Sequence, residues 1–183
     1  METKSESIVT HLQPLVGLKL TIARRSADMR IFHFGPIRKI SGGTIGDYAL
    51  HVQCPWRIEG PQGIVTGRSD LWEPPVIIPG VQWDPIEHYD RGNLQDVLIR
   101  KWLGGYDPET HSPINQTDQF FVEGVQADNC GGAVITLSGG YRLVLFPTGA
   151  AQSEDWRLFR PTVDSSGSTP YFIVTGGKIE AEE

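Results

Sequence analysis

The segment at residues 47–57, Asp-Tyr-Ala-Leu-His-Val-Gln-Cys-Pro-Trp-Arg, constrains the fold of this chain more than any other stretch. Its side chains alternate in character with a period of two residues, which is typical of a β-strand that buries one face. Pro55 has no backbone N–H for a sheet ladder, so we expect the strand to end or bulge there. The alternation predicts a core face and an opposite face, formed respectively by Tyr48, Leu50, Val52 and Cys54 and by Ala49, His51 and Gln53.

The same pattern returns in the second half of the chain. Residues 48–57 run from a Tyr-x-Leu strand through a proline to Trp-Arg, and residues 141–157 do so again. One interpretation is an ancient duplication that forms a pseudo-twofold pair of small sheets with a site between them. The other is coincidence, because short repeats are weak evidence of common origin. A duplication predicts pseudo-repeats at residues 15–72 and 119–175, joined by a proline-rich connector and a helix at 93–103.

That helix has recognisable ends. Asn93 is a favourable N-cap, Asp96 places an acidic group in the first turn, and Gly104 and Gly105 stop the helix. The spacing of apolar residues predicts one buried face. Its expected members are Leu94, Val97, Leu98 and Trp102.

Short strands are expected over most of the remaining chain. The 21 glycines and 13 prolines are scattered, which fits many turns between strands. Residues 138–140, Ser-Gly-Gly, predict a hairpin, and a short helix at residues 5–12 is expected to end at Pro14. The predicted fold class is α+β, mainly β: a single globular domain of 183 residues with two antiparallel β halves and one amphipathic helix between them.

Charge and cysteine content limit the partners. The formal net charge is −6 and the 16 lysines and arginines are dispersed, so we expect no nucleic-acid binding. No apolar run approaches the ~20 residues that span a bilayer, and the N-terminus has no apolar signal segment, so no membrane partner is expected. Two cysteines are too few for a disulfide framework. We therefore expect a cytoplasmic protein with reduced thiols, as a monomer or a homodimer.

His51 and Cys54 are the first candidates for chemistry. A His-x-x-Cys spacing can hold zinc or pair a thiol with a base. A structural zinc site needs four ligands, however, and Cys130 stands alone in the sequence. Residues three apart on a strand also face opposite sides. We expect a packed cysteine and an exposed imidazole, with no catalytic residue, no metal site and no cofactor.

Two further features are candidates for binding. The loop at residues 83–90 concentrates carboxylates, an imidazole and aromatic rings, which suits a cation or acid–base site but also suits a solvated loop. The Trp-Arg pairs could anchor a partner, or could place tryptophan inward and arginine outward. The candidate binding residues are His51, Gln53, Arg57, Trp83, Glu87 and His88.

Residues 50–58, Leu-His-Val-Gln-Cys-Pro-Trp-Arg-Ile, are followed by residues 67–72, Gly-Arg-Ser-Asp-Leu-Trp. Together they resemble a family of small uncharacterised bacterial proteins, a domain of unknown function. The resemblance covers mainly residues 15–72 and implies no activity. Small acidic proteins of this kind sometimes stand beside toxins as immunity proteins, which is an analogy at the level of the family.

Two functions of different classes fit these features. The first is a non-catalytic binding or protein-interaction module with a protein partner, such as an immunity-type inhibitor. The second is a small-ligand-binding protein or an enzyme that uses a cleft between the two β halves, with His51, Glu87 and His88 nearby.

Overall fold

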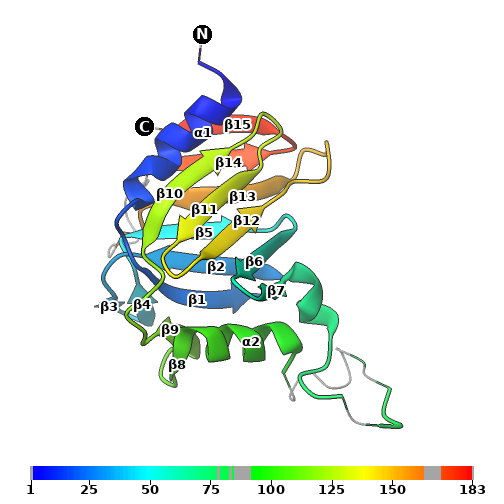
Figure 1. Ribbon diagram of the computed structural model, residues 1–183. Helices are drawn as coiled ribbons and strands as arrows, with labels where there is room; N and C mark the ends of the chain where they lie inside the picture. Colours follow the sequence, from blue (N-terminus) through cyan, green and yellow to red (C-terminus); the bar gives the residue numbers. More distant parts are fainter. Residues whose placement is uncertain (1, 78, 83, 85–91, 163–169, 183) are drawn as a thin grey trace.

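The computed structural model describes residues 2–77, 79–82, 84, 92–162 and 170–182. In these residues, two antiparallel sheets face each other across one hydrophobic core, and two α-helices lie against them (Figure 1). The predicted class, α+β and mainly β, is confirmed.

Within the described residues, the larger sheet has eight strands in the order β15-β14-β13-β5-β2-β1-β9-β8. These are β1 (Leu20–Ser26), β2 (Met29–Phe34), β5 (Tyr48–Val52), β8 (Gly104–Asp107), β9 (Ser112–Asn115), β13 (Glu154–Phe159), β14 (Tyr171–Thr175) and β15 (Lys178–Glu182). The smaller sheet has the order β10-β11-β12-β6-β7. Its strands are β6 (Trp56–Gly60), β7 (Gly63–Gly67), β10 (Val122–Ala127), β11 (Ala133–Leu137) and β12 (Tyr141–Leu145). A separate hairpin joins β3 (Arg38–Ile40) to β4 (Gly43–Ile45).

Both helices begin within one residue of the predicted position and end at the predicted residue, although Pro14 lies inside a 3₁₀ turn after the first helix. Helix α1 (Lys4–Leu12) buries Ile8 and Leu12 and runs into a 3₁₀ turn, η1 (Gln13–Leu15). Helix α2 (Leu94–Leu103) is capped by the side chain of Asn93 and ends at Gly104, whose φ is 77°. A second 3₁₀ turn, η2 (Arg68–Trp72), follows β7.

The predicted buried face of α2 is right only in part: Trp102 packs against the hydrophobic core, but Leu94 and Leu98 are only half-buried. Val97 is 46% exposed, and the fully buried positions are Gln95, Ile99 and Leu103. Polar contacts rotate the helix: Gln95 Nε2 donates to the carbonyl oxygen of Gly67 (2.8 Å), and Asp96 pairs with arginines of β1 and β2. The spacing of apolar residues carries no information about such polar contacts, so it predicted a neighbouring face of the helix as the buried one.

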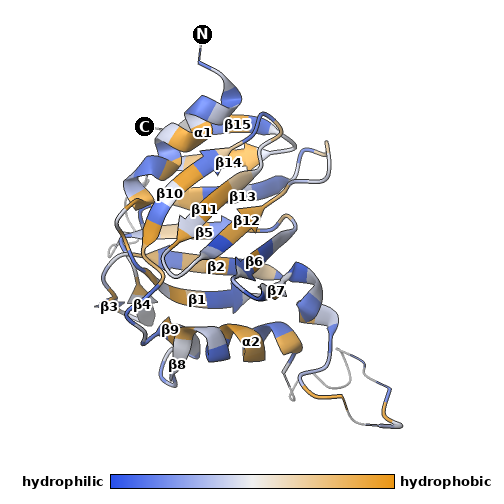
Figure 2. Ribbon diagram, in the orientation of Figure 1, coloured by the Kyte–Doolittle hydropathy of each residue, from blue (hydrophilic) through white to orange (hydrophobic). Residues whose placement is uncertain are grey.

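The core face of β5 is confirmed. Leu50, Val52 and Cys54 are buried in the main hydrophobic cluster, with Tyr48 packed against its margin. Apolar and polar residues alternate along strands of both sheets (Figure 2). Trp56 and Trp156 also lie fully inside, so each Trp-Arg pair points its tryptophan inward, as one of the two interpretations expects.

Both sheets contain strands from both halves of the chain. In the first half, β1, β2 and β5 form a meander in the larger sheet, and the chain then crosses to β6 and β7 in the smaller one. In the second half, β10, β11 and β12 form a meander in the smaller sheet, and the chain then crosses to β13 and β14 in the larger one. The halves therefore interleave and do not form one sheet each.

The pairing registers repeat between the halves. Trp56 on β6 pairs with Leu145 on β12, and Trp156 on β13 pairs with Val52 on β5. Leu145 is the last residue of β12 and Val52 is the last residue of β5, and each of these strands is the third in its meander. Each tryptophan therefore lies opposite the end of the other half's meander. An approximate twofold relation between β5-β6 and β12-β13 accounts for both pairs.

The entry to each meander obeys the same relation. The backbone N–H of Leu20 donates to the carbonyl of Phe120 (2.9 Å), and that of Val122 donates to the carbonyl of Leu18 (2.8 Å). The β1–β2 register shifts just after Leu20, and the β10–β11 register shifts just after Val122. The two halves share one strand plan, which a duplication predicts; their common origin stays a prediction.

Within the described residues, no helix has the length and apolar character needed to cross a membrane.

Candidate functional site

His51 lies on the outer face of β5 and is half-buried, so the expectation of an exposed imidazole is wrong. Its ring meets the ring of Phe159 edge-on, with 4.8 Å between centroids. Burial, together with the positive charge of Arg157, lowers the pKa of His51 to about 4. The ring is therefore neutral at pH 7 and a weak proton acceptor, which suits packing better than acid–base chemistry.

Gln53 and Cys54 form the bend after β5. Gln53 Nε2 donates to Glu154 Oε1 (3.0 Å), and Arg68 donates to the carbonyl oxygen of Gln53. Cys54 is buried, and burial raises the pKa of its thiol to about 12. Because the thiolate is the reactive form, Cys54 is a packing residue, as predicted.

Three of the predicted candidates, Trp83, Glu87 and His88, lie outside the described residues. Among the residues that are described, no group of three or more His, Cys, Asp or Glu side chains is arranged to hold a metal ion. His51 and Gln53 line neither of the two hollows described next.

Arg57 is the predicted candidate that does border a hollow. Its Nε donates to Glu59 Oε1 (2.7 Å), and its guanidinium carbon lies 5.5 Å from the centroid of the Phe146 ring. The alternation of the strand turns Arg57 outward while Trp56 enters the core. A cation and an aromatic ring are thereby held together at the surface.

The hollow beside Arg57 has a volume of about 510 Å³. We call it the β7 groove and define it by Arg57, Ile64, Arg68, Trp72 and Phe146. Ile64 is 67% exposed and Trp72 is 55% exposed. Tryptophan is highly buried on average, so such exposure is unusual. Tryptophan and arginine are also the residues most enriched among the energetic anchors of protein interfaces.

Local hydrogen bonds place Trp72 at this surface. Asp70 Oδ2 accepts from Thr66 Oγ1 (2.8 Å) and from the backbone N–H of Gly67 (3.0 Å), which turns the chain from β7 into η2. A Cβ at Gly67 would lie 2.9 Å from the carbonyl oxygen of Trp56, so β7 can approach β6 only with glycine there. The turn then leaves Trp72 outside the core.

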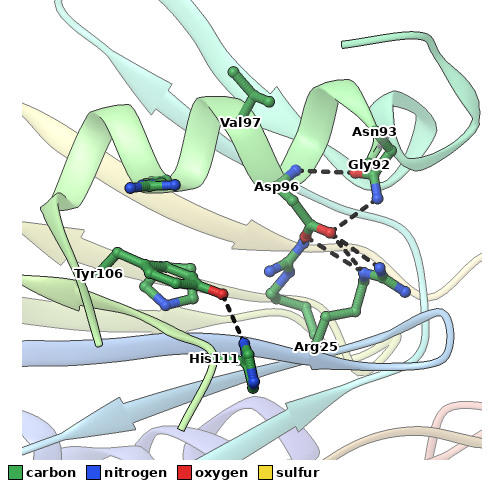
Figure 3. Close-up of a pocket in the computed structure, with 10 residues that line it drawn as sticks. Arg25, Gly92, Asn93, Asp96, Val97, Tyr106 and His111 are labelled. Carbon is green, nitrogen blue, oxygen red and sulfur yellow. Dashed lines mark hydrogen bonds and ion pairs between the residues drawn. The ribbon is translucent and has the colours of Figure 1, made fainter. Parts of the chain in front are cut away.

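A second hollow lies between α2 and the hairpins β1–β2 and β8–β9 (Figure 3). Its volume is about 280 Å³. We call it the arginine pocket and define it by Arg25, Arg30, Asp96, Val97, Arg100 and His111.

Arg30 is the buried anchor of this pocket, with its side chain only 1% exposed. Its Nη2 donates to Asp96 Oδ1 (2.7 Å), its Nε donates to Gln95 Oε1 (3.1 Å), and its Nη1 donates to the carbonyl oxygen of Ala23 (3.3 Å). Arg25 Nη2 lies 3.0 Å from Asp96 Oδ2. Two guanidinium groups therefore share one carboxylate.

Electrostatics keep that carboxylate ionised. Burial by itself raises the pKa of Asp96, but hydrogen bonds from Arg25 and the charge of Arg30 outweigh it and hold the pKa below its usual value. Burial lowers the pKa of Arg30, and the Asp96 carboxylate opposes this shift. The pair of arginines and the aspartate join α2 to the β1–β2 hairpin.

The other end of the pocket holds a cation with free donors. The guanidinium carbon of Arg100 lies 4.5 Å from the centroid of the Tyr106 ring, and Tyr106 Oη lies 3.3 Å from His111 Nδ1 (Figure 3). In the part of the chain that the structure describes, the side chain of Arg100 makes no hydrogen bond and no ion pair. Its N–H groups are available to a ligand.

No residue of the arginine pocket is among the candidate binding residues predicted from the sequence. Arg25 was counted only among the dispersed basic residues, and Asp96 was explained as an acidic residue in the first turn of a helix. Arg25 and Asp96 are 71 positions apart, so only packing of α2 beside β1 brings them together. The one available signal was a basic pair in a strand together with charged residues at 96 and 100, one turn apart on a helix.

No protein-family model matches the chain, and searches of the curated proteins and of the solved structures also find no match.

Proposed function

We propose that this protein is a non-catalytic protein-interaction module that binds a partner protein through the β7 groove. The observation that carries the proposal is the exposure of Trp72 beside a cation–aromatic pair, Arg57 and Phe146. A few central aromatic and arginine side chains supply most of the binding energy of protein interfaces. The β7 groove gathers both residue types in one concave surface.

Burial of the apolar groups supplies the affinity. Covering a side chain such as Ile64 fully is worth about 1.5–3 kcal/mol, and Trp72 offers a larger surface. Arg57 and Arg68 are already held by Glu59 and Asp28, at 2.7 and 2.8 Å. Such side chains lose less conformational freedom on binding than free ones do.

The apolar surface continues along the chain. Val76, Ile77 and Val81 follow Trp72 in the proline-rich connector, and all three are exposed (Figure 2). A net charge of −6 favours encounter with a basic partner. An immunity-type inhibitor of a basic toxin is the specific form of this proposal.

The test is affinity capture from the cells that produce the protein, with three baits: the wild type, Trp72→Ala and Phe121→Ala. Phe121 is a matched control because it is an aromatic residue, 41% exposed, outside the β7 groove. We expect the wild type and Phe121→Ala to recover the same partner and Trp72→Ala to lose it. With purified partner, calorimetry should show about 30-fold weaker binding for Trp72→Ala, as for an interface hot spot.

Equal affinity of the partner for wild type and Trp72→Ala would contradict the assignment of the groove. Recovery of no partner by any bait would contradict the proposed function itself.

A further inference from the structure

The charges that line the arginine pocket do not balance. Arg25, Arg30 and Arg100 carry three positive charges and Asp96 carries one negative charge, so the lining has a formal excess of two. The whole protein, by contrast, has a net charge of −6. A concave site with walls of low dielectric focuses such a local excess and raises the local concentration of anions.

Arg100 is the group that can accept an anion without breaking an existing contact. Arg25 and Arg30 already donate to Asp96, whereas the guanidinium of Arg100, among the described residues, has only its stack on Tyr106. Stacking occupies the flat face of a guanidinium and leaves its in-plane N–H groups free for a carboxylate or phosphate. The stack also holds the group in one orientation before any ligand arrives.

The size and wall of the pocket narrow the ligand class. A volume of about 280 Å³ lies just below the usual range for ligand cavities, about 300–1,000 Å³, so the ligand must be small. Val97 and Pro113 contribute apolar surface, and Val97 points outward because polar contacts rotate α2. An anion with a short hydrocarbon body fits this combination better than a bare inorganic anion does.

We propose that the arginine pocket binds a free small carboxylate, with the carboxylate paired to Arg100 and the hydrocarbon body against Val97. This site is separate from the β7 groove and does not depend on it, because the two hollows share no lining residue.

The test is isothermal titration calorimetry on the full chain with three probes: isobutyrate, its neutral isostere isobutyramide, and inorganic phosphate. We expect isobutyrate to bind at one site with a Kd of about 1 mM or tighter, and the other two probes to give no binding. Arg100→Gln should weaken isobutyrate binding about tenfold or more, because it removes a charge-assisted contact. Lys101→Gln is the matched control, since it removes a neighbouring exposed charge outside the pocket.

Both residues are exposed, so neither substitution should change the thermal midpoint appreciably. A second variant, Val97→Glu, places a carboxylate at the pocket and should abolish isobutyrate binding. The proposal is overturned by equal binding of isobutyramide, by equal losses in Arg100→Gln and Lys101→Gln, by phosphate binding in place of isobutyrate, or by no isobutyrate binding at about 10 mM. None of these outcomes bears on the partner-binding test, because Trp72 lies outside the pocket.

Discussion

At the scale of single residues, burial keeps two histidines of this fold, His33 and His51, neutral at pH 7. His33 on β2 is 4% exposed, and its Nδ1 accepts a hydrogen bond from the backbone N–H of Gly46 (3.2 Å). Burial lowers the pKa of His33 to about 3, with smaller contributions from the charges of Arg24 and His51. The same hydrogen bond requires a neutral ring, so geometry and electrostatics agree.

The folded protein should lose stability on mild acidification through His33. In the unfolded chain its pKa is about 6.5, so unfolding takes up a proton below that pH, and the free energy of unfolding falls as the pH drops from about 6.5 towards 3. At pH 5 the loss is about 2 kcal/mol. His33→Gln keeps an acceptor for Gly46 but does not titrate. Urea unfolding at pH 7 and pH 5 should therefore show a loss about 2 kcal/mol smaller in His33→Gln, and equal losses would contradict this account.

At the scale of elements, the equivalent strands β6 and β13 differ in whether the indole N–H of their tryptophan has a hydrogen-bond partner. Trp156 Nε1 donates to the carbonyl oxygen of Gly131 (2.8 Å), whereas Trp56 Nε1 is buried without a partner in the described part of the chain. Gly131 belongs to the longer connection between β10 and β11. The matching connection, between β1 and β2, is a tight turn at Ala27 (φ 51°). A difference in loop length thus leaves one indole N–H unpaired.

Replacement of each tryptophan by phenylalanine separates this hydrogen bond from packing. Both variants lose a similar volume from the core, but Trp156→Phe also leaves the carbonyl of Gly131 without its donor. We expect Trp156→Phe to be more destabilising than Trp56→Phe by about 1 kcal/mol, measured from urea midpoints at pH 7. A larger loss in Trp56→Phe would show that packing differences outweigh the hydrogen bond.

At the scale of the whole molecule, the interleaved strands make the two halves depend on each other. β5 pairs with β13 and β6 pairs with β12, so the centre of each sheet joins strands from different halves. Neither half can complete a sheet or bury its core face alone, since an isolated set of so few strands is marginal in water.

Fragments of residues 1–82 and 83–183 should each be unfolded when expressed separately. Mixed in equal amounts, they should recover the far-ultraviolet circular dichroism of the intact chain and melt in one cooperative transition. A cooperative transition in either fragment alone would show that the halves are independent domains.

The local elements could largely be predicted, and the functional surfaces could not. Strand β5, the limits of α2 and the inward tryptophans follow from patterns within a few residues of each other. Among the candidate binding residues that the structure describes, only Arg57 borders one of the two hollows described above. The prediction that His51 is exposed was wrong because Phe159, which is distant in the sequence, packs against its ring. Trp72 is absent from the predicted candidates because a period-two pattern carries no information about the hydrogen bonds of Asp70 that turn the chain outward.

The sequence by itself determined the class of the fold, the positions of its turns and the strand pattern shared by its halves, because these depend on alternation, capping and glycine or proline placement. Only the tertiary structure decided that the halves exchange strands between two sheets. It also brought Arg25 and Arg30 of one hairpin to Asp96 of a helix on the far side of the connector. Contacts of that kind depend on which elements lie side by side, and that choice is made by burial summed over the whole core rather than by any local stretch.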